Sequence, residues 1–282
     1  MLVLFRHGMD DSSNIVLIGL SLSDLIYSCS ETYTRIMYIT ARIDSFIANN
    51  LLSVYVAFFL YISTYGTSTS VWLVALISIE RMIAVCFPFH VSRLMSPVRM
   101  RFMVVFVFTF VAIFYSPSFC MYYLDLVFNK KINRTVLTSF KRKEYIDNLW
   151  WLSIFLEYIL PSFMNAVPMI TILTCTFATI VNLIKANKNS AKISNSRAKR
   201  VKEMRSIKIA LIICCSMAFS ILIPTAFLDA YSSYGLNINT TMIIYAIDQL
   251  AVQTNATMNF FIYVALSSKF KSKVLKMFQC TK

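Results

Sequence analysis

The chain has 282 residues, of which 58% are hydrophobic and 14% are charged, and its formal net charge is +14. A composition so apolar and so poor in charge excludes a water-soluble domain of this size and indicates a membrane protein. In a membrane protein a basic excess follows the topology, so this charge does not indicate a nucleic-acid partner.

Six apolar stretches follow one another along the chain, each long enough to cross about 30 Å of hydrocarbon as a helix. With only 4 glycines and many Leu, Ile, Phe and Met residues, they favour helices over the alternating strands of a barrel. We therefore predict an all-α, multi-pass membrane bundle that forms a single domain over residues 1–282. The predicted spans are residues 15–39, 51–85, 102–124, 149–184, 207–231 and 241–266.

Basic residues gather in the connections on one side of such a bundle, and the positive-inside rule makes that side cytoplasmic. They lie between the second and third spans, over residues 185–208 and over residues 269–282. The opposite connections carry glycosylation sequons at Asn133 and Asn239, which need an outer location to be modified. Charge and sequons therefore predict the same orientation. The basic runs need have no function beyond setting this orientation in the membrane.

The end of the chain has the pattern of a short amphipathic helix lying on the inner leaflet. Apolar residues from Phe270 to Phe278 recur at helical spacing, and lysines fall mostly on the other face. Cys280 follows them, either as a palmitoylation site or as an unmodified thiol. We expect this segment to contact membrane lipids.

The second span ends in an adjacent acid and base, Glu80 and Arg81. Such a pair at a helix end can be an interfacial ion pair whose side chains reach the head groups. The pattern Glu-Arg-x-x-x-Val-x-x-Pro-aromatic over residues 80–89 also resembles the third helix of rhodopsin-like G-protein-coupled receptors. The resemblance implies that Glu80 restrains Arg81 at rest and that Arg81 meets the G protein on activation. It also implies that Phe89, after Pro88, docks on the G protein.

Other segments resemble the same family. Residues 14–25, with Asp24, are similar to its second helix, and Asn259 and Tyr263 stand where its seventh helix carries Asn-Pro-x-x-Tyr. The resemblance implies a sodium site, because a dehydrated cation needs several converging oxygens; otherwise Asp24 bonds a neighbouring helix. The residues of that sodium site would be Asp24, Ser70, Asn255 and Asn259.

The resemblance begins within the family's first helix, so we expect a truncated seven-helix receptor whose six complete spans are helices two to seven. The chain also departs from the family. Val56 replaces a helix-three cysteine, residues 122–148 contain no cysteine, and Phe260 replaces the proline of helix seven. The usual outer disulfide is therefore absent and the activation relay is altered. A receptor remnant that no longer signals is accordingly a second candidate function.

The ligand is only partly constrained by the sequence. Ser63 stands where amine receptors carry an aspartate, and Gln253 where opsins carry the retinal lysine, which disfavours both classes. The narrower resemblance is to invertebrate FMRFamide-like peptide receptors and Srw-type chemoreceptors. Acids in the outer half could meet a cationic group of a peptide or pair with Arg35 or Arg42. The candidate pocket residues are Glu31, Ser63, Thr64, Thr67, Asp229, Asp248 and Gln253.

Rival classes are less well supported. An enzyme is not predicted, because no His, Cys and acidic residues have metal-ligand or triad spacing. No cofactor is expected beyond the sodium ion. A secondary transporter usually has repeated halves and Gly- or Pro-broken helices, so it is the less favoured alternative. We predict a plasma-membrane receptor that binds an extracellular ligand, a peptide or a chemosensory small molecule, and activates a heterotrimeric G protein.

Overall fold

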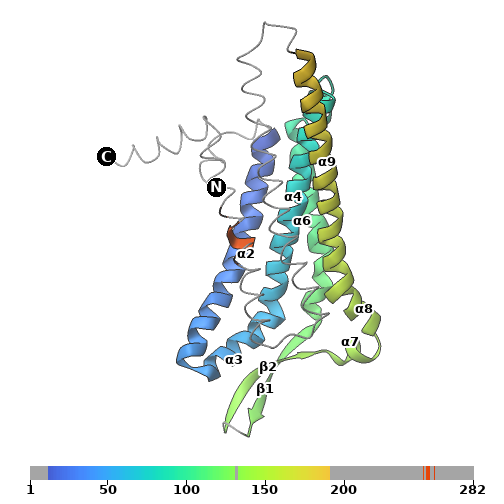
Figure 1. Cartoon of the computed structure of the whole chain (residues 1–282). Coiled ribbons are helices and arrows are strands. Elements are labelled where there is room, and N and C mark those ends of the chain that lie inside the picture. Colours follow the sequence, from blue (N-terminus) through green and yellow to red (C-terminus); the bar gives the residue numbers. More distant parts are fainter. Residues whose placement is uncertain (1–11, 131–132, 191–249, 251, 255–256, 258–282) are drawn as a thin grey trace, which may run out of the picture. The chain divides into compact units, whose positions relative to one another are not determined.

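The computed structural model describes residues 12–130, 133–190, 250, 252–254 and 257 (Figure 1). Within them, 4 helical stretches are long and apolar enough to cross a membrane, and each takes up one of the first four predicted spans. Most of the last two predicted spans, and the whole amphipathic tail, lie outside the described residues. The four stretches are Asn14–Ile43, Ser45–Cys86, Pro97–Cys120 and Trp150–Asn182.

The elements follow one another with short connections. The first stretch lies in α2 (Ser12–Ile43). The second consists of α3 (Ser45–Val54), a π-helical turn η1 (Tyr55–Phe59) and α4 (Leu60–Cys86). The short helix α5 (Val91–Leu94) follows it. The third is α6 (Pro97–Tyr115) with a 3-10 turn η2 (Ser116–Cys120). The strands β1 (Tyr122–Asn129) and β2 (Arg134–Lys141) come next, then α7 (Lys143–Asp147), α8 (Trp150–Ile154), a second π-helical turn η3 (Phe155–Ile159) and α9 (Leu160–Ser190).

The break between α2 and α3 has a local cause. Asp44 has an extended backbone, and its carboxylate accepts hydrogen bonds from the Phe46 and Ile47 amides at 2.8 and 3.4 Å. An aspartate in this position satisfies amide groups that have no partner inside the first turn of a helix. The chain therefore starts a new helix directly after α2 ends.

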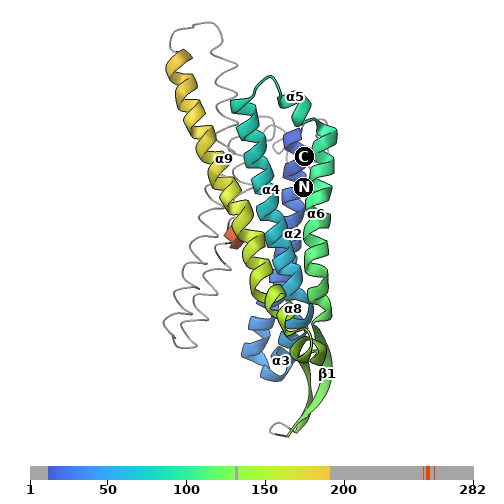
Figure 2. The same ribbon diagram turned by 90° about the vertical axis from the view of Figure 1, so that its right-hand side faces the viewer.

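The β1–β2 hairpin corrects the all-α prediction (Figures 1 and 2). The strands pair antiparallel from Tyr122 opposite Lys141 to Asn129 opposite Arg134. The third span, predicted to reach residue 124, ends instead at Cys120, because Pro117 lacks an amide hydrogen and lies in the closing 3-10 turn. The following residues are rich in aromatic and β-branched side chains, which favour a strand.

The chain divides into two compact units, which we describe separately. The arginine unit, named for Arg81, takes in Met1–Ile18, Leu73–Arg101 and Pro168–Lys282, of which parts are described. The hairpin unit, named for β1 and β2, takes in Gly19–Trp72 and Phe102–Val167.

In the hairpin unit, α2 and α4 approach closely at Gly66. A Cβ atom added to Gly66 would lie 2.9 Å from the backbone nitrogen of Tyr27. No side chain fits there, so glycine is required by contact rather than by backbone conformation. α6 is joined to α4 by Ser68 and Tyr115, whose hydroxyls lie 3.1 Å apart.

In the arginine unit, Leu73 and Val74 of α4 are fully buried. Asn182 of α9 donates a hydrogen bond from Nδ2 to the sulfur of Cys86 at 3.1 Å and a second to the carbonyl of Ala178 at 2.9 Å. The end of α4 is therefore joined to α9 by a polar contact.

Candidate functional site

The predicted Glu80–Arg81 pair lies in the last two turns of α4. Arg81 Nη2 is 3.6 Å from Glu80 Oε2, and the two side chains are 20% and 7% exposed. The buried carboxylate therefore has a guanidinium beside it, as an acid removed from water requires. The two groups are therefore close together, and the restraint of Arg81 by Glu80 at rest stays a prediction.

Pro88 and Phe89 follow the end of α4 in the turn that leads to α5. Phe87 still donates to the Ile83 carbonyl at 2.8 Å, and the chain leaves the helix directly afterwards. Phe89 is 93% exposed, which is unusual for so large an apolar side chain. The structure thus presents Phe89 as an apolar residue free to contact a partner.

The structure brings together two of the four predicted sodium-site residues. Ser70 on α4 donates a hydrogen bond to Asp24 Oδ1 on α2 at 2.8 Å. Ser70 is buried and Asp24 is half-buried, so a hydroxyl and a carboxylate from two helices converge at a partly shielded position. This donor set suits a hard cation, which prefers oxygen ligands. Asn255 and Asn259 lie outside the described residues.

A second pairing of the same kind joins α2 and α4. Ser63 donates to Glu31 Oε1 at 2.9 Å, and Glu31 is 1% exposed. Glu31 follows Asp24 by seven residues, and Ser63 precedes Ser70 by seven, so the two pairs lie two helical turns apart. We call these two carboxylate–serine pairs the rungs. Gly66, between Ser63 and Ser70, allows the close approach that both rungs need.

The other predicted pocket residues have different positions. Thr64 and Thr67 donate to the carbonyls of Leu60 and Ser63, one turn back on their own helix. Their hydroxyls are therefore hydrogen-bonded within α4 and, through these bonds, do not join it to another helix. Gln253 is half-buried, and Asp229 and Asp248 lie outside the described residues.

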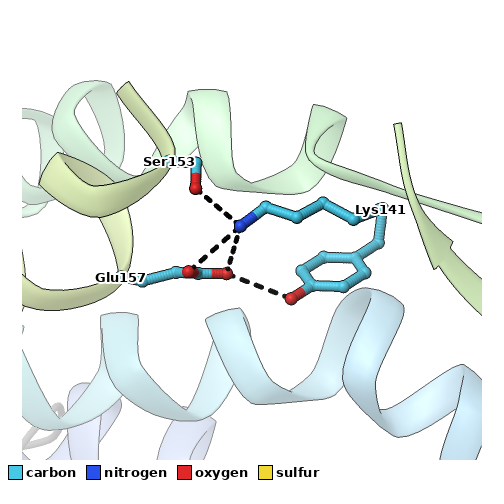
Figure 3. A network of polar contacts seen from close by, with 4 residues as sticks. Lys141, Ser153 and Glu157 are labelled. Carbon is cyan, nitrogen blue, oxygen red and sulfur yellow. Dashed lines mark hydrogen bonds and ion pairs between the residues drawn. The ribbon is translucent and has the colours of Figure 1, made fainter. Parts of the chain in front are cut away.

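A polar network that the sequence analysis missed joins the hairpin to α8 and η3 (Figure 3). Lys141 Nζ lies 2.6 Å from Ser153 Oγ and 3.0 and 3.1 Å from the two carboxylate oxygens of Glu157. Tyr122 donates from its hydroxyl to Glu157 Oε1 at 3.1 Å. Burial, followed by the negative charge of Glu157, raises the pKa of Tyr122 to about 12. The only sequence signal was an acid near the start of an apolar span, and no spacing rule linked it to Lys141.

A second missed feature, which we call the Leu137 clamp, holds β2 against α3. Asn50 Oδ1 accepts from the Leu137 amide at 2.8 Å, and Ser53 Oγ donates to the Leu137 carbonyl at 2.8 Å. Both backbone groups of one edge residue are therefore satisfied by side chains of a helix. The guanidinium of Arg134 also lies 5.5 Å from the ring centre of Phe46 on α3.

The predicted glycosylation site at Asn133 lies in the turn of the hairpin. Asn133 has a φ of 51°, a left-handed conformation that asparagine adopts more readily than most residues. Asn133 and Thr135 of the sequon are both exposed. The sequon is therefore accessible, whereas Asn239 and the palmitoylation candidate Cys280 lie outside the described residues.

A comparison with protein families matches residues 1–263 to the 7 transmembrane receptor (rhodopsin family). A comparison with curated proteins gave no match. The family match covers most of the 282 residues, and the chain belongs to the rhodopsin family of seven-transmembrane receptors. Members of this family are membrane receptors that signal to G proteins, and they are not enzymes. The match gives no support to the narrower resemblance to FMRFamide-like or Srw-type receptors.

Proposed function

We propose that the chain is a plasma-membrane receptor that binds an extracellular ligand and activates a heterotrimeric G protein through Arg81. The proposal is supported by the arrangement of side chains at the end of α4. There a buried Glu80 lies beside Arg81, and Phe89 is 93% exposed eight residues after the arginine. An arginine held by a neighbouring acid can be released without unfolding the helix, and an exposed aromatic side chain can anchor a partner.

Two acids of the hairpin unit are candidate ligand contacts. Glu31 is the buried acid of the rung that it forms with Ser63, and Glu157 lies in the Lys141 network. Carboxylates in these positions favour a ligand that carries a cationic group, in agreement with a peptide or an amine.

We further propose that a sodium ion binds at Asp24 and Ser70 as an allosteric ligand. The hydrogen bond between them supports the proposal, because it shows that their oxygens lie close enough to share an ion. The purified chain should unfold at a higher temperature in sodium chloride than in choline chloride. Asp24→Asn should remove this difference, and Ser162→Ala, at an exposed serine of α9, should retain it.

The functional test is nucleotide exchange on a purified G protein by the reconstituted chain, with a library of short amidated peptides and amines as probes. Arg81→Ala should abolish any stimulated exchange, because the proposed mechanism acts through the Arg81 guanidinium. Arg42→Ala, at an exposed arginine in the last turn of α2, is the matched control and should leave exchange unchanged.

Three results would separate the candidate functions. Exchange that persists in Arg81→Ala would contradict the mechanism. A folded chain that binds probes without stimulating exchange would indicate the non-signalling remnant. Concentrative uptake of a probe, unaffected by Arg81→Ala, would favour the transporter.

A further inference from the structure

An ammonium group is bound beside η3, and it belongs to the chain itself. Lys141 Nζ lies 2.6 Å from Ser153 Oγ, and 3.0 and 3.1 Å from the two oxygens of Glu157. A primary ammonium has three N–H donors, and here three oxygens surround it (Figure 3). The arrangement is therefore a complete coordination shell for a primary ammonium group.

The acidic side of this shell is held in place. Ser153 and Glu157 are four residues apart and lie on consecutive turns of one helix, across the junction of α8 and η3. Glu157 Oε1 also accepts from Tyr122 at 3.1 Å, and Ser153 is 6% exposed. Glu157 lies in the π-helical turn η3, and such turns frequently occur at functional sites.

The ammonium side is the movable one. Lys141 is the last residue of β2, and its charge is carried on a flexible four-carbon side chain. The side chains of Lys141 and Glu157 are 23% and 26% exposed, so water reaches the pair. Ion pairs with this degree of exposure are weak, and a competitor with additional contacts can replace one partner. An incoming ammonium need displace only Lys141, whereas an incoming carboxylate would have to displace a glutamate that Tyr122 also holds.

We propose that Ser153, Glu157 and Tyr122 form a binding site for a primary ammonium group, and that Lys141 occupies this site when no ligand is present. The proposal rests on the proposed receptor function, which it deepens by naming the ligand class as one that carries a primary alkylammonium. Binding exchanges one ammonium for another at the same three oxygens. The released Lys141 side chain then moves into water, and no covalent bond forms or breaks.

The test is chemical rescue in the full chain, purified in lipid nanodiscs. Lys141→Ala removes the internal ammonium but leaves the three oxygens. Adding n-butylammonium chloride to this variant should raise its unfolding midpoint saturably, by about 2–4 °C, with sodium chloride as the ionic-strength control. The wild-type chain should respond much less at the same concentrations, because its own lysine fills the site. Lys143→Ala, which removes an exposed lysine two residues away, should behave like wild type.

Two controls make the result specific to the site. Tetramethylammonium carries the same charge without N–H donors and should give no rescue of Lys141→Ala. The double variant Lys141→Ala with Glu157→Gln should not respond to butylammonium. If Lys141→Ala does not fold, Lys141→Gln provides a second variant, because its neutral amide should be a weaker occupant that butylammonium can still displace.

A midpoint that does not move in Lys141→Ala and Lys141→Gln, or that moves equally in the double variant, would overturn the ammonium site. This readout needs neither a G protein nor the native ligand. Absence of rescue by butylammonium therefore does not contradict the proposed receptor function. Absence of stimulated nucleotide exchange likewise does not contradict the ammonium site.

Discussion

The two units hold their charged groups in different ways. In the arginine unit, the Glu80–Arg81 ion pair joins adjacent residues of one helix. In the hairpin unit, Asp24, Glu31 and Glu157 have hydrogen-bond partners that are 46, 32 and 16 residues away. The first arrangement survives any movement that keeps a helix intact, whereas the second depends on how several segments pack. Substitutions that alter packing should therefore affect the hairpin unit first.

The largest effect is expected from the contact between α2 and α4. Gly66→Val would force side-chain atoms against Tyr27, whose backbone nitrogen lies 2.9 Å from the position of an added Cβ. Overpacking of this kind costs about 3 kcal/mol and outweighs the helix propensity gained on replacing glycine. Thermal unfolding should show the loss, and Thr67→Ala, at the next residue, should change stability little. Unchanged stability in Gly66→Val would show that the two helices separate readily.

A smaller effect is expected from removing one rung. Ser63→Ala deletes the hydroxyl that donates to the buried Glu31 and should lower the free energy of unfolding by about 2 kcal/mol. Adding Glu31→Gln should recover part of the loss, because a neutral amide is less costly to bury than a carboxylate. Ser162→Ala is the control, since Ser162 is exposed. Equal effects of Ser63→Ala and Ser162→Ala would mean that the rung contributes nothing to stability.

Disrupting the Leu137 clamp should change hydrogen exchange only locally, at the Leu137 amide. Asn50→Leu keeps the approximate shape of the side chain but cannot accept from the Leu137 amide, so that amide should exchange with solvent about tenfold faster. Asn50→Asp keeps an acceptor oxygen and should restore slow exchange. Asn49→Leu makes the same change at the exposed neighbouring position and should leave exchange at Leu137 as in wild type. Faster exchange throughout the hairpin unit in Asn49→Leu would remove the support for a specific clamp.

The smallest effect at neutral pH concerns Tyr122. Because burial and Glu157 raise its pKa from 10.0 to about 12, the folded state favours the protonated phenol. This contribution to stability is fully present below pH 10 and is lost as the pH rises through about 12. The phenolate absorbance of wild type minus that of Tyr122→Phe should therefore show a midpoint near 12, and Glu157→Gln should lower it. A midpoint at 10 would place Tyr122 in water and away from Glu157.

The sequence was most informative where the relevant residues are close together in it. Glu80 and Arg81 are neighbours, so their contact was predictable, and the spacing that placed Asp24 and Ser70 in one site gave a pair that the structure joins. Four spans followed directly from apolar runs of sufficient length. Whether the remaining two predicted spans cross a membrane stays a prediction.

The hairpin and its attachments could not be predicted in the same way. Tyr122 and Lys141 are nineteen residues apart and pair at the open end of a hairpin whose turn lies between Asn129 and Arg134. The sequence analysis predicted a connection over most of this segment. Asn50 is 87 residues from its partner Leu137. Side-chain contacts of this kind depend on how two elements pack against each other, so they cannot be predicted from the sequence around either residue.

The π-helical turn that carries Glu157 has a further consequence for how such a site can arise. A π-helical turn is an α-helical turn with one inserted residue. Removing one residue from Phe155–Ile159 would restore the regular helix and rotate Ser153 by about 100° relative to α9. One codon gained or lost could thus redirect a whole row of side chains while every residue type stayed the same. Ligand preference at the proposed ammonium site can therefore change through helix length as readily as through substitution.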